Sequence, residues 1–227
     1  MARQGKRYRA DFEKTPKGAE AVPLTEAVNR VKSFKPLKFD QSVELAIQLG
    51  IDPTQADQAV RGSLSLPHGI GKTKRVVAFC GDDKVAAAKE AGAVEAGGED
   101  LVAKIEGGWM EFDVAVASPE MMRVVSKLGR SLGPKGLMPS PKSGTVTPNV
   151  AEAVKEYAAG KVEYRNDKGG NVHVVVGKQS FSPDKIEQNA QAFIDHIARI
   201  KPAAAKGQYI KKITLSATMT PGVPVTV

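Results

Sequence analysis

The chain has 227 residues, 41% of them hydrophobic and 26% charged, which is typical of a globular protein long enough for two modest domains. Its 33 Lys and Arg outnumber its 25 Asp and Glu, so the net charge of +8 favours a polyanionic partner. Aromatic residues make up only 5%, which argues against a nucleic-acid binder that stacks on many successive bases. The single cysteine, Cys80, excludes an intramolecular disulfide and indicates a reducing compartment.

The N-terminal segment is basic and has no apolar stretch of the kind found in secretory signals. No apolar run approaches the ~18 residues that span a bilayer, so we expect a cytoplasmic protein without a membrane partner. Residues 1–20 carry six basic side chains and few apolar ones, which predicts a basic arm rather than a packed element.

Two clear periodicities follow this segment. Apolar residues recur at helical spacing from Leu24 to Phe34, and Pro36 ends the pattern, which predicts a helix. From Val43 to Ile51 apolar residues alternate with polar or small ones, which predicts a half-buried strand. Such a strand suits an antiparallel sheet with one solvated face.

Between Lys74 and Gly160, continuous apolar runs alternate with helical segments. RVVAFC and FDVAVAS predict buried strands, and helices are predicted in DDKVAAAKEAGA, EDLVAKIEGG, PEMMRVVSKLG and TPNVAEAVKEYAAG. Pro119 is expected at the first position of its helix, and Thr147 is expected to be the N-cap of the last one. This alternation predicts βαβ units with a parallel sheet covered by helices on both faces.

After Gly160 the first pattern returns. KVEYRND and NVHVVVGK predict strands, and Ser182 and Pro183 open a predicted amphipathic helix. In the last predicted strand, YIKKITLSATM, one side is expected to carry Ile213, Leu215, Ala217 and Met219.

The charge is distributed unevenly along the chain. Residues 68–159 carry twelve Lys and Arg and twelve Asp and Glu, so the whole excess lies in the flanking segments. We therefore expect a discontinuous α+β domain, built from residues 1–67 and 160–227, with helices on an antiparallel or mixed sheet. An α/β domain of Rossmann-like, three-layer type is expected to be inserted at residues 68–159.

Signatures of enzymes and cofactor sites are incomplete. Gly71-Lys72-Thr73 matches the end of a P-loop, but Leu66 stands where G-x-x-x-x-G-K-[ST] needs its first glycine. After RVVAFC, two aspartates stand where a dinucleotide pyrophosphate would bind, and their charge would repel it. The three histidines and the cysteine show no metal-ligand spacing. We expect no enzyme activity, metal or cofactor; the alternative, a nucleotide-dependent α/β protein, would bind ATP or NAD in calorimetry.

Residues 129–145, GRSLGPKGLMPSPKSGT, form a cationic segment rich in Gly and Pro that lacks acidic residues. Its 17 residues exceed the usual length of loops without secondary structure, and such long loops are usually functional or disordered. We predict a contact with an anionic partner, made by Arg130, Gly133, Lys135, Gly136 and Lys142. The alternative is a solvated connection between two regular elements.

A second group of residues stands at strand ends in the basic domain. Lys38-Phe39 precedes the alternating strand, and Thr218-Met219 ends the last one. A hydroxyl, a thioether and an aromatic ring in such places could dock on a base or on a ribose 2′-OH. The alternative, slightly favoured by the pattern, is that Phe39 and Met219 pack in the core. His173, on a strand of the same domain, could also touch RNA, although an ordinary surface histidine is the simpler interpretation.

Several stretches resemble the ribosomal protein L-one family, the large-subunit stalk proteins, in its bacterial form. They are GKRYR, KFDQSVELAIQLGIDP, RGSLSLPHGIGK, GGWMEFD, SKLGRSLGPKGLMPSPKSGTV, VEYRNDKGG and KITLSATMTPGV, which together extend over nearly the whole chain. The resemblance implies two hinged domains, of which the discontinuous one holds the main site for large-subunit ribosomal RNA. Matching positions for that site are Glu26, Phe39, Ser42, Thr218 and Met219, with Lys38, Arg165 and Lys168 as basic support.

The resemblance also implies partners and roles. The 129–145 segment would make secondary RNA contacts, and the protein would help deacylated tRNA leave the exit site as part of the mobile stalk. Binding to its own operon's mRNA would repress translation; no DNA partner is implied. The alternative is a free regulatory RNA-binding protein. Two positions depart from the family: Thr220 replaces a usual glycine within the site, and Ser42 stands where Thr is common but keeps the hydroxyl.

Overall fold

The computed structural model describes residues 5–15 and 20–226 and contains both helices and sheets, as expected for a mixed α/β fold. The chain divides into two compact units. The first unit runs to Gly71 and resumes at Tyr164, and the second is Lys72–Glu163, so its borders lie a few residues beyond those expected from charge. Two basic residues of the expected basic arm, Arg3 and Lys17, fall outside the described residues.

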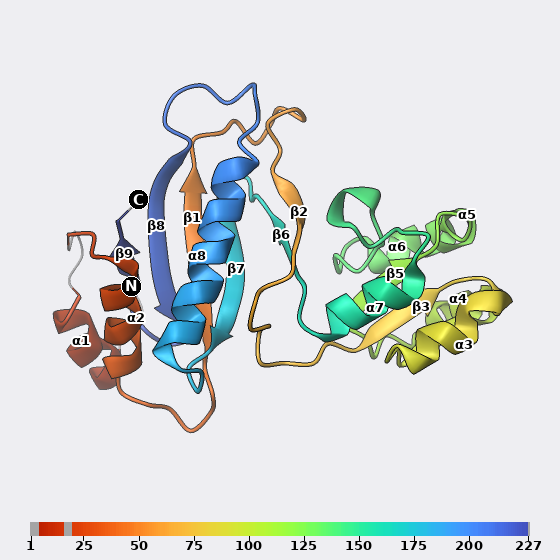
Figure 1. Cartoon of the computed structure of the whole chain (residues 1–227), viewed down its shortest axis with the longest axis horizontal. Coiled ribbons are helices and arrows are strands. Elements are labelled where there is room, and N and C mark those ends of the chain that lie inside the picture. The colour runs from red at the N-terminus through yellow and green to blue at the C-terminus, as the bar shows by residue number, and fades with distance from the viewer. Residues whose placement is uncertain (1–4, 16–19, 227) are drawn as a thin grey trace. The chain divides into compact units, whose positions relative to one another are not determined.

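The first unit is built around a four-stranded antiparallel sheet with the strand order β7-β1-β8-β9. A separate two-stranded sheet joins β2 and β6. The elements of this unit are α1 (Lys6–Glu13), α2 (Leu24–Ser33), β1 (Ser42–Leu49), β2 (Arg61–Leu64), β7 (Asn171–Lys178), α8 (Pro183–Arg199), β8 (Ile210–Ala217) and β9 (Val223–Val225) (Figure 1). Strand β6 (Val162–Arg165) crosses the border, because its first two residues belong to the second unit and its last two to the first.

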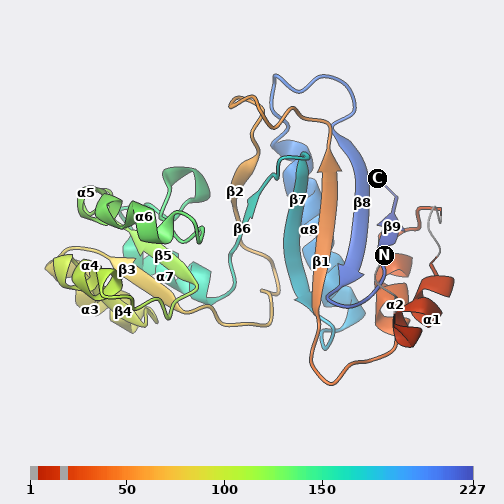
Figure 2. The same cartoon turned by 180° about the vertical axis from the view of Figure 1, so that it is seen from behind.

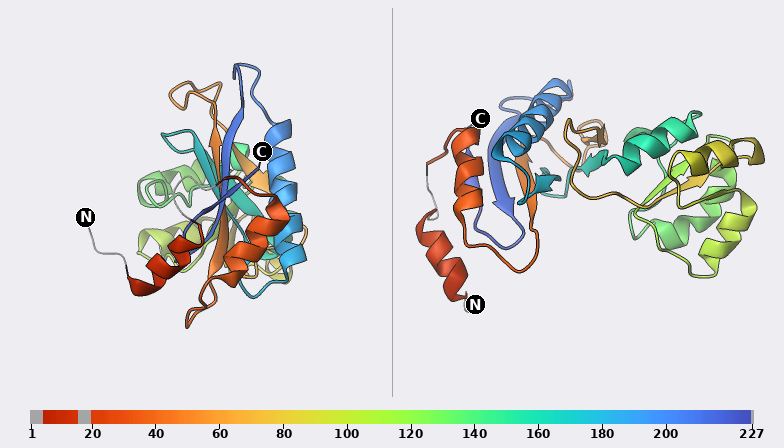
Figure 3. Two further views of the ribbon diagram at one scale, coloured as in Figure 1. Left: turned by 90° about the vertical axis from the view of Figure 1, so that its left-hand side faces the viewer. Right: turned by 60° about the horizontal axis from the view of Figure 1, so that its bottom comes forward.

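The two faces of this sheet differ as the alternating pattern predicts. Val43, Leu45 and Ile47 of β1 are fully buried, and α2 and α8 lie together on one face of the sheet (Figure 3, left). On the opposite face, which Figure 2 presents to the viewer, β1 carries Glu44 and Gln48, which are only partly buried or exposed. The predicted half-buried strand is therefore confirmed, and its helix-covered face forms the core of the unit.

The second unit has a three-stranded parallel sheet with the order β4-β3-β5. All four residues of β3 and of β5 are buried, which confirms the two strands predicted from continuous apolar runs. Helices α3 and α7 pack against one face, while α4 and the segment from α5 to α6 pack against the other. The elements are β3 (Val76–Phe79), α3 (Asp82–Glu90), β4 (Glu95–Gly97), α4 (Glu99–Glu106), β5 (Val114–Ala117), α5 (Met122–Val125), η1 (Ser126–Leu128), α6 (Gly129–Leu132), η2 (Pro141–Ser143) and α7 (Val150–Ala158).

The structure corrects the expected basic arm. Residues Lys6–Glu13 form helix α1, and its Asp11 is buried to 3% exposure. The scarcity of apolar residues did not predict a packed helix, because the inward face of α1 carries polar side chains. The buried Asp11 lies one turn after Arg7, with 4.0 Å between the carboxylate and the guanidinium.

The structure also corrects the view of residues 129–145 as a loop without secondary structure. The segment begins with α6, which continues α5 and η1, and it contains the 3₁₀ turn η2. Leu128 and Leu132 are fully buried on the inner side of this helical run. Gly133 ends the run tightly, because a Cβ atom there would lie only 2.5 Å from the Gly129 carbonyl oxygen.

Two expected helix starts are also displaced. Pro119 lies in a turn before α5 rather than at its first position, and α7 begins at Val150 with Asn149, not Thr147, as its N-cap. The Thr147 hydroxyl instead accepts a hydrogen bond from Asn149 N at 3.2 Å. A side-chain acceptor near a helix start fixes the local turn in several ways, and sequence alone does not choose among them.

Tyr157 of α7 attaches the 129–145 segment to the core of the second unit. Its side chain is fully buried, and its hydroxyl donates a hydrogen bond to the Ser143 carbonyl oxygen at 2.7 Å. Tyr157→Phe should lower the free energy of unfolding of the protein by about 1–3 kcal/mol, because a buried carbonyl loses its partner. Urea denaturation followed by circular dichroism measures this change, and Tyr8→Phe, on a half-buried residue of α1, is the control. An unchanged unfolding midpoint would contradict the assigned role of this hydrogen bond.

Candidate nucleic-acid interface

Phe39 and Met219 are exposed rather than packed in the core. Their side chains are 50% and 52% exposed, and Val94 in the second unit is the other large hydrophobic residue of the described chain with comparable exposure. The preference for a core position is therefore wrong for both residues. Met219 also lies beyond the end of β8, so it does not share the buried side formed by Ile213, Leu215 and Ala217.

The two exposed residues flank neighbouring strand ends, because β1 and β8 are antiparallel and Val43 pairs with Ala217. Ser42 N donates to the Thr218 hydroxyl at 3.1 Å, and Thr218 N donates to the Ser42 carbonyl at 3.1 Å. The Lys178 ammonium donates to the Ser42 hydroxyl at 2.9 Å. We call residues 38–42, 178–180 and 218–219 the strand-end surface.

A shallow groove of about 490 Å³ lies beside Phe39 on this surface. The Lys38 side chain on its wall is exposed and has no hydrogen bond or ion pair with the described residues. Asp40, by contrast, is engaged: its carboxylate accepts hydrogen bonds from Ser180 N at 3.0 Å and from the Ser180 hydroxyl at 2.8 Å. The groove therefore offers an unpaired cation and an aromatic ring, while its acidic group is held by the protein.

Gln41 belongs to this surface but was missed from sequence. It is fully buried, its Oε1 accepts a hydrogen bond from Met219 N at 3.0 Å, and its Nε2 donates to Gln179 Oε1 at 2.8 Å. A glutamine one residue before an alternating strand gives no sign in the sequence that its amide will be enclosed. Its partners lie 138 and 178 residues away along the chain.

Thr220, the departure from the family glycine, has a structural role in its own turn. It is 9% exposed, and its hydroxyl accepts a hydrogen bond from Ala217 N at 2.9 Å. Among the described residues only glycines have positive φ, so Thr220 adopts an ordinary backbone conformation. The threonine therefore closes the turn that presents Met219, and its side chain is not available at the surface.

The remaining predicted RNA-binding residues of the first unit do not join the strand-end surface through a described contact. Glu26 forms an ion pair with Arg30 at 2.6 Å within α2. Arg165 and Lys168 lie at and after the end of β6, and His173 is exposed on β7 opposite Ala46. On β7 the strand-end surface begins at Lys178. His173 is five residues before it, a distance on the order of 15 Å along an extended strand.

Close in sequence to Arg165, Lys168 and His173, Asp167 organises the turn between β6 and β7. Its carboxylate accepts hydrogen bonds from Asn171 N at 2.7 Å and Gly169 N at 2.8 Å, and these bonds lower the pKa of Asp167. The imidazole of His173 lies 3.9 Å from the same carboxylate. The Asp167 carboxylate is therefore ionised at neutral pH, and the exposed side chains of Lys168 and His173 lie close to it in the sequence.

The second unit presents the other predicted group. Arg130, Lys135 and Lys142 are exposed, as are Gly133 and Gly136, and none of these cations forms an ion pair within the described chain. Two further exposed cations, Arg123 and Lys127, precede Arg130 at the i, i+4 and i+7 spacing of one helical face. The sequence prediction placed these two in a helix and Arg130 in a separate loop, whereas the helical run continues from α5 through η1 and α6 to Leu132.

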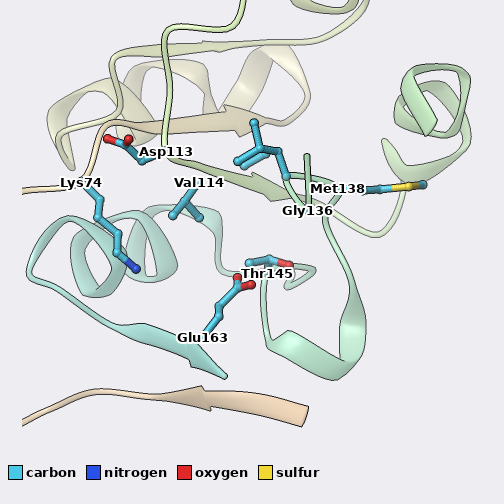
Figure 4. Close-up of a pocket in the computed structure, with 9 residues that line it drawn as sticks. Lys74, Asp113, Val114, Gly136, Met138, Thr145 and Glu163 are labelled. Carbon is cyan, nitrogen blue, oxygen red and sulfur yellow. The ribbon is translucent and has the colours of Figure 1, made fainter. Parts of the chain in front are cut away.

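A cavity of about 160 Å³ in the second unit carries the charged groups Lys74, Asp113 and Glu163 (Figure 4). The Lys74 ammonium donates to the Lys161 carbonyl at 2.8 Å, and its burial lowers its pKa. A hydrogen bond from Arg75 N, at 3.1 Å, lowers the pKa of Asp113. The hydrogen bond from Lys74 to Lys161 joins the two ends of the unit, and Asp113 is held by Arg75.

Over the described chain, no group of three or more His, Cys, Asp or Glu residues is arranged to hold a metal ion. Among the helices of the same residues, none is long and apolar enough to cross a membrane.

Comparison of the sequence with known proteins identifies a matching family. The model of the ribosomal protein L1p/L10e family matches residues 31–221. A protein of Rhodopirellula baltica called large ribosomal subunit protein uL1 is 57% identical over 225 residues, which is 99% of both chains. A protein of the same name from Saccharopolyspora erythraea is 49% identical over 225 residues, covering 99% of this chain and 94% of the other.

Proposed function

The chain belongs to the ribosomal protein L1p/L10e family, and from this we propose that it is a constituent of the large ribosomal subunit that binds ribosomal RNA. The observation that carries the proposal is the exposure of Phe39 and Met219 beside the Ser42 and Thr218 hydroxyls. A protein surface that combines apolar groups with fixed hydroxyls suits ribose and base edges. The net charge of +8 supplies the attraction to phosphate.

Each component of the strand-end surface would have a distinct role. Because the Ser42 hydroxyl already accepts a hydrogen bond from Lys178, its own hydrogen is free to be donated to a ribose or phosphate oxygen. Phe39 and Met219 would cover a ribose or base face, and Lys38 would contact a phosphate. The 2′-OH is the group by which such a site distinguishes RNA from DNA.

We further propose a division of roles between two domains that correspond to the two compact units. The first would hold the main ribosomal RNA site, with Glu26, Arg165, Lys168 and His173 as outlying contributors. The second would make secondary contacts with RNA, including tRNA at the exit site, through Arg130, Gly133, Lys135, Gly136 and Lys142. Their exposure and their lack of ion pairs within the described chain support this assignment.

We also propose that the free protein binds its own operon's mRNA and represses its translation, as a cytoplasmic protein that exchanges with the ribosome. The alternative is a free regulator that never joins the ribosome. Sucrose-gradient sedimentation of a cell extract separates them, because we expect the protein in the large-subunit fraction at one copy per subunit. Its presence only at the top of the gradient would overturn the ribosomal role and leave the free regulator.

A further inference from the structure

Met219 has an exposed side chain, but its backbone is held on both sides by side chains from other segments. The Gln41 Oε1 accepts a hydrogen bond from Met219 N at 3.0 Å, and the Arg7 Nη2 donates to the Met219 carbonyl oxygen at 2.9 Å. Arg7 lies 212 residues away along the chain. Because both the N–H and the carbonyl oxygen of Met219 are held, the protein sets the direction of the exposed Met219 side chain before any partner binds.

The Gln41 amide has no freedom to turn away from Met219. Besides its bond to Met219 N, its Nε2 donates to Gln179, and the Gln41 carbonyl accepts a hydrogen bond from Gln179 N at 2.8 Å. The residue is 0% exposed. Rotation of the amide would leave buried polar groups without partners, which costs the free energy of their desolvation.

The Arg7 side chain is only partly exposed, at 27%. Its Nη1 atom is shielded from solvent, and Asp11, 4.0 Å away, is itself buried. Asp11 Oδ1 in turn accepts a hydrogen bond from Lys35 N at 3.4 Å, at the start of the segment that leads to Phe39. Helix α1 thereby connects the two parts of the chain that carry the exposed apolar side chains.

We propose that Arg7 and Gln41 are positioning residues that fix the Met219 peptide, and that α1 is part of the RNA-binding platform. The inference rests on the proposed function, because it concerns how the strand-end surface is prepared for RNA. In this proposal both residues act through the Met219 peptide and not by touching RNA themselves. Fixing the turn before binding reduces the conformational entropy that specific binding must otherwise remove.

Matched variants on α1 separate this role from simple attraction to phosphate. Arg7→Leu and Arg9→Leu remove one charge each from the same helix, but Arg9 is exposed and its side chain makes no described contact. The probes are the organism's large-subunit ribosomal RNA and a mixed-sequence RNA duplex of similar length, each titrated at several salt concentrations. Arg7→Leu should weaken ribosomal RNA binding roughly 10-fold, the scale of one charged hydrogen bond, and should leave duplex binding unchanged.

The salt dependence gives the second readout. Loss of a phosphate contact lowers the slope of log K against log salt by about 0.9 on a duplex, whereas loss of a positioning contact leaves it unchanged. Equal weakening of both RNAs by Arg7→Leu, with a reduced slope, would show that Arg7 is a phosphate contact and would overturn the proposal. If the unaltered protein binds ribosomal RNA specifically and Arg7→Leu binds it equally tightly, the positioning role alone is overturned. If the unaltered protein binds both RNAs equally, the proposed function and the positioning role are both overturned.

A readout without RNA tests the same contacts directly. In protein labelled with ¹³C at the methionine methyl groups, the Met219 resonance is assigned with Met219→Leu. Arg7→Leu and Gln41→Leu should move this resonance toward its random-coil position, while Met110 and Met138 of the second unit stay unchanged. Because Arg7→Leu leaves Asp11 buried without its partner, Arg7→Leu combined with Asp11→Leu keeps the helix interior apolar. An unmoved Met219 resonance in the Gln41→Leu and double variants would refute the proposal.

Discussion

Phe39→Ala and Met219→Ala should each weaken binding to large-subunit ribosomal RNA by about 1–3 kcal/mol, the range measured for stacking contacts on single-stranded nucleic acids. This corresponds to a loss of affinity of roughly 5-fold to 150-fold per residue. Both side chains are about half exposed, so removing them leaves no large cavity and should preserve folding. Filter binding at fixed salt concentration measures the effect, and a melting curve verifies that the fold is intact.

Val94→Ala provides the matched control for these two variants. Val94 is 49% exposed, which is close to the exposure of Phe39 and Met219, but it lies in the second unit. We expect its affinity to equal that of the unaltered protein. If Phe39→Ala and Met219→Ala both bind as tightly as the control, the strand-end surface is not the RNA site.

A shortened chain in which a short flexible linker connects residue 67 to residue 160 should fold and retain specific binding to ribosomal RNA. The removed residues 68–159 carry no net charge, so the full excess of +8 stays in the shortened protein. Its main sheet β7-β1-β8-β9 loses no strand. This cut also keeps β6 whole, because β6 begins at Val162. We expect an affinity within about 10-fold of the full chain, since a few phosphate contacts of the second unit are lost.

The complementary fragment, residues 68–159, serves as the control for this division. It retains the parallel sheet and the exposed cations Arg130, Lys135 and Lys142. We expect only weak binding that disappears at high salt concentration and does not prefer ribosomal RNA. A folded shortened chain without specific affinity, or a fragment that binds as tightly as the full protein, would reverse the proposed assignment.

The regular elements could be predicted because their cause is local. The alternation from Val43 to Ile51 and the continuous apolar run of RVVAFC each specify how many faces of a strand are buried. Helix starts were less certain, as Thr147 shows, because several short polar residues near one start can accept the same backbone hydrogen bonds.

The exposure of Phe39 and Met219 could not be predicted in the same way. Met219 continues the alternation of Ile213, Leu215 and Ala217, and this pattern extends past the end of β8 without any signal that the packed layer has ended. Phe39 lies between the predicted helix and the predicted strand, where neither pattern says whether a side chain is buried. Helix α1 was missed for the opposite reason, because its inward face carries Arg7 and Asp11 instead of apolar residues. Burial of such a pair depends on partners more than twenty residues away, among them Lys35 and Met219.

The sequence by itself determined the family, the basic character of the outer segments and the type of sheet in each part of the chain, since these follow from composition, motif and periodicity. Only the tertiary structure decided that Gln41 and Arg7 meet at the Met219 peptide and that Thr220 closes its turn. The physical reason is that hydrogen bonds between distant segments depend on where the packed core brings the backbone, and no local pattern of residues encodes that position.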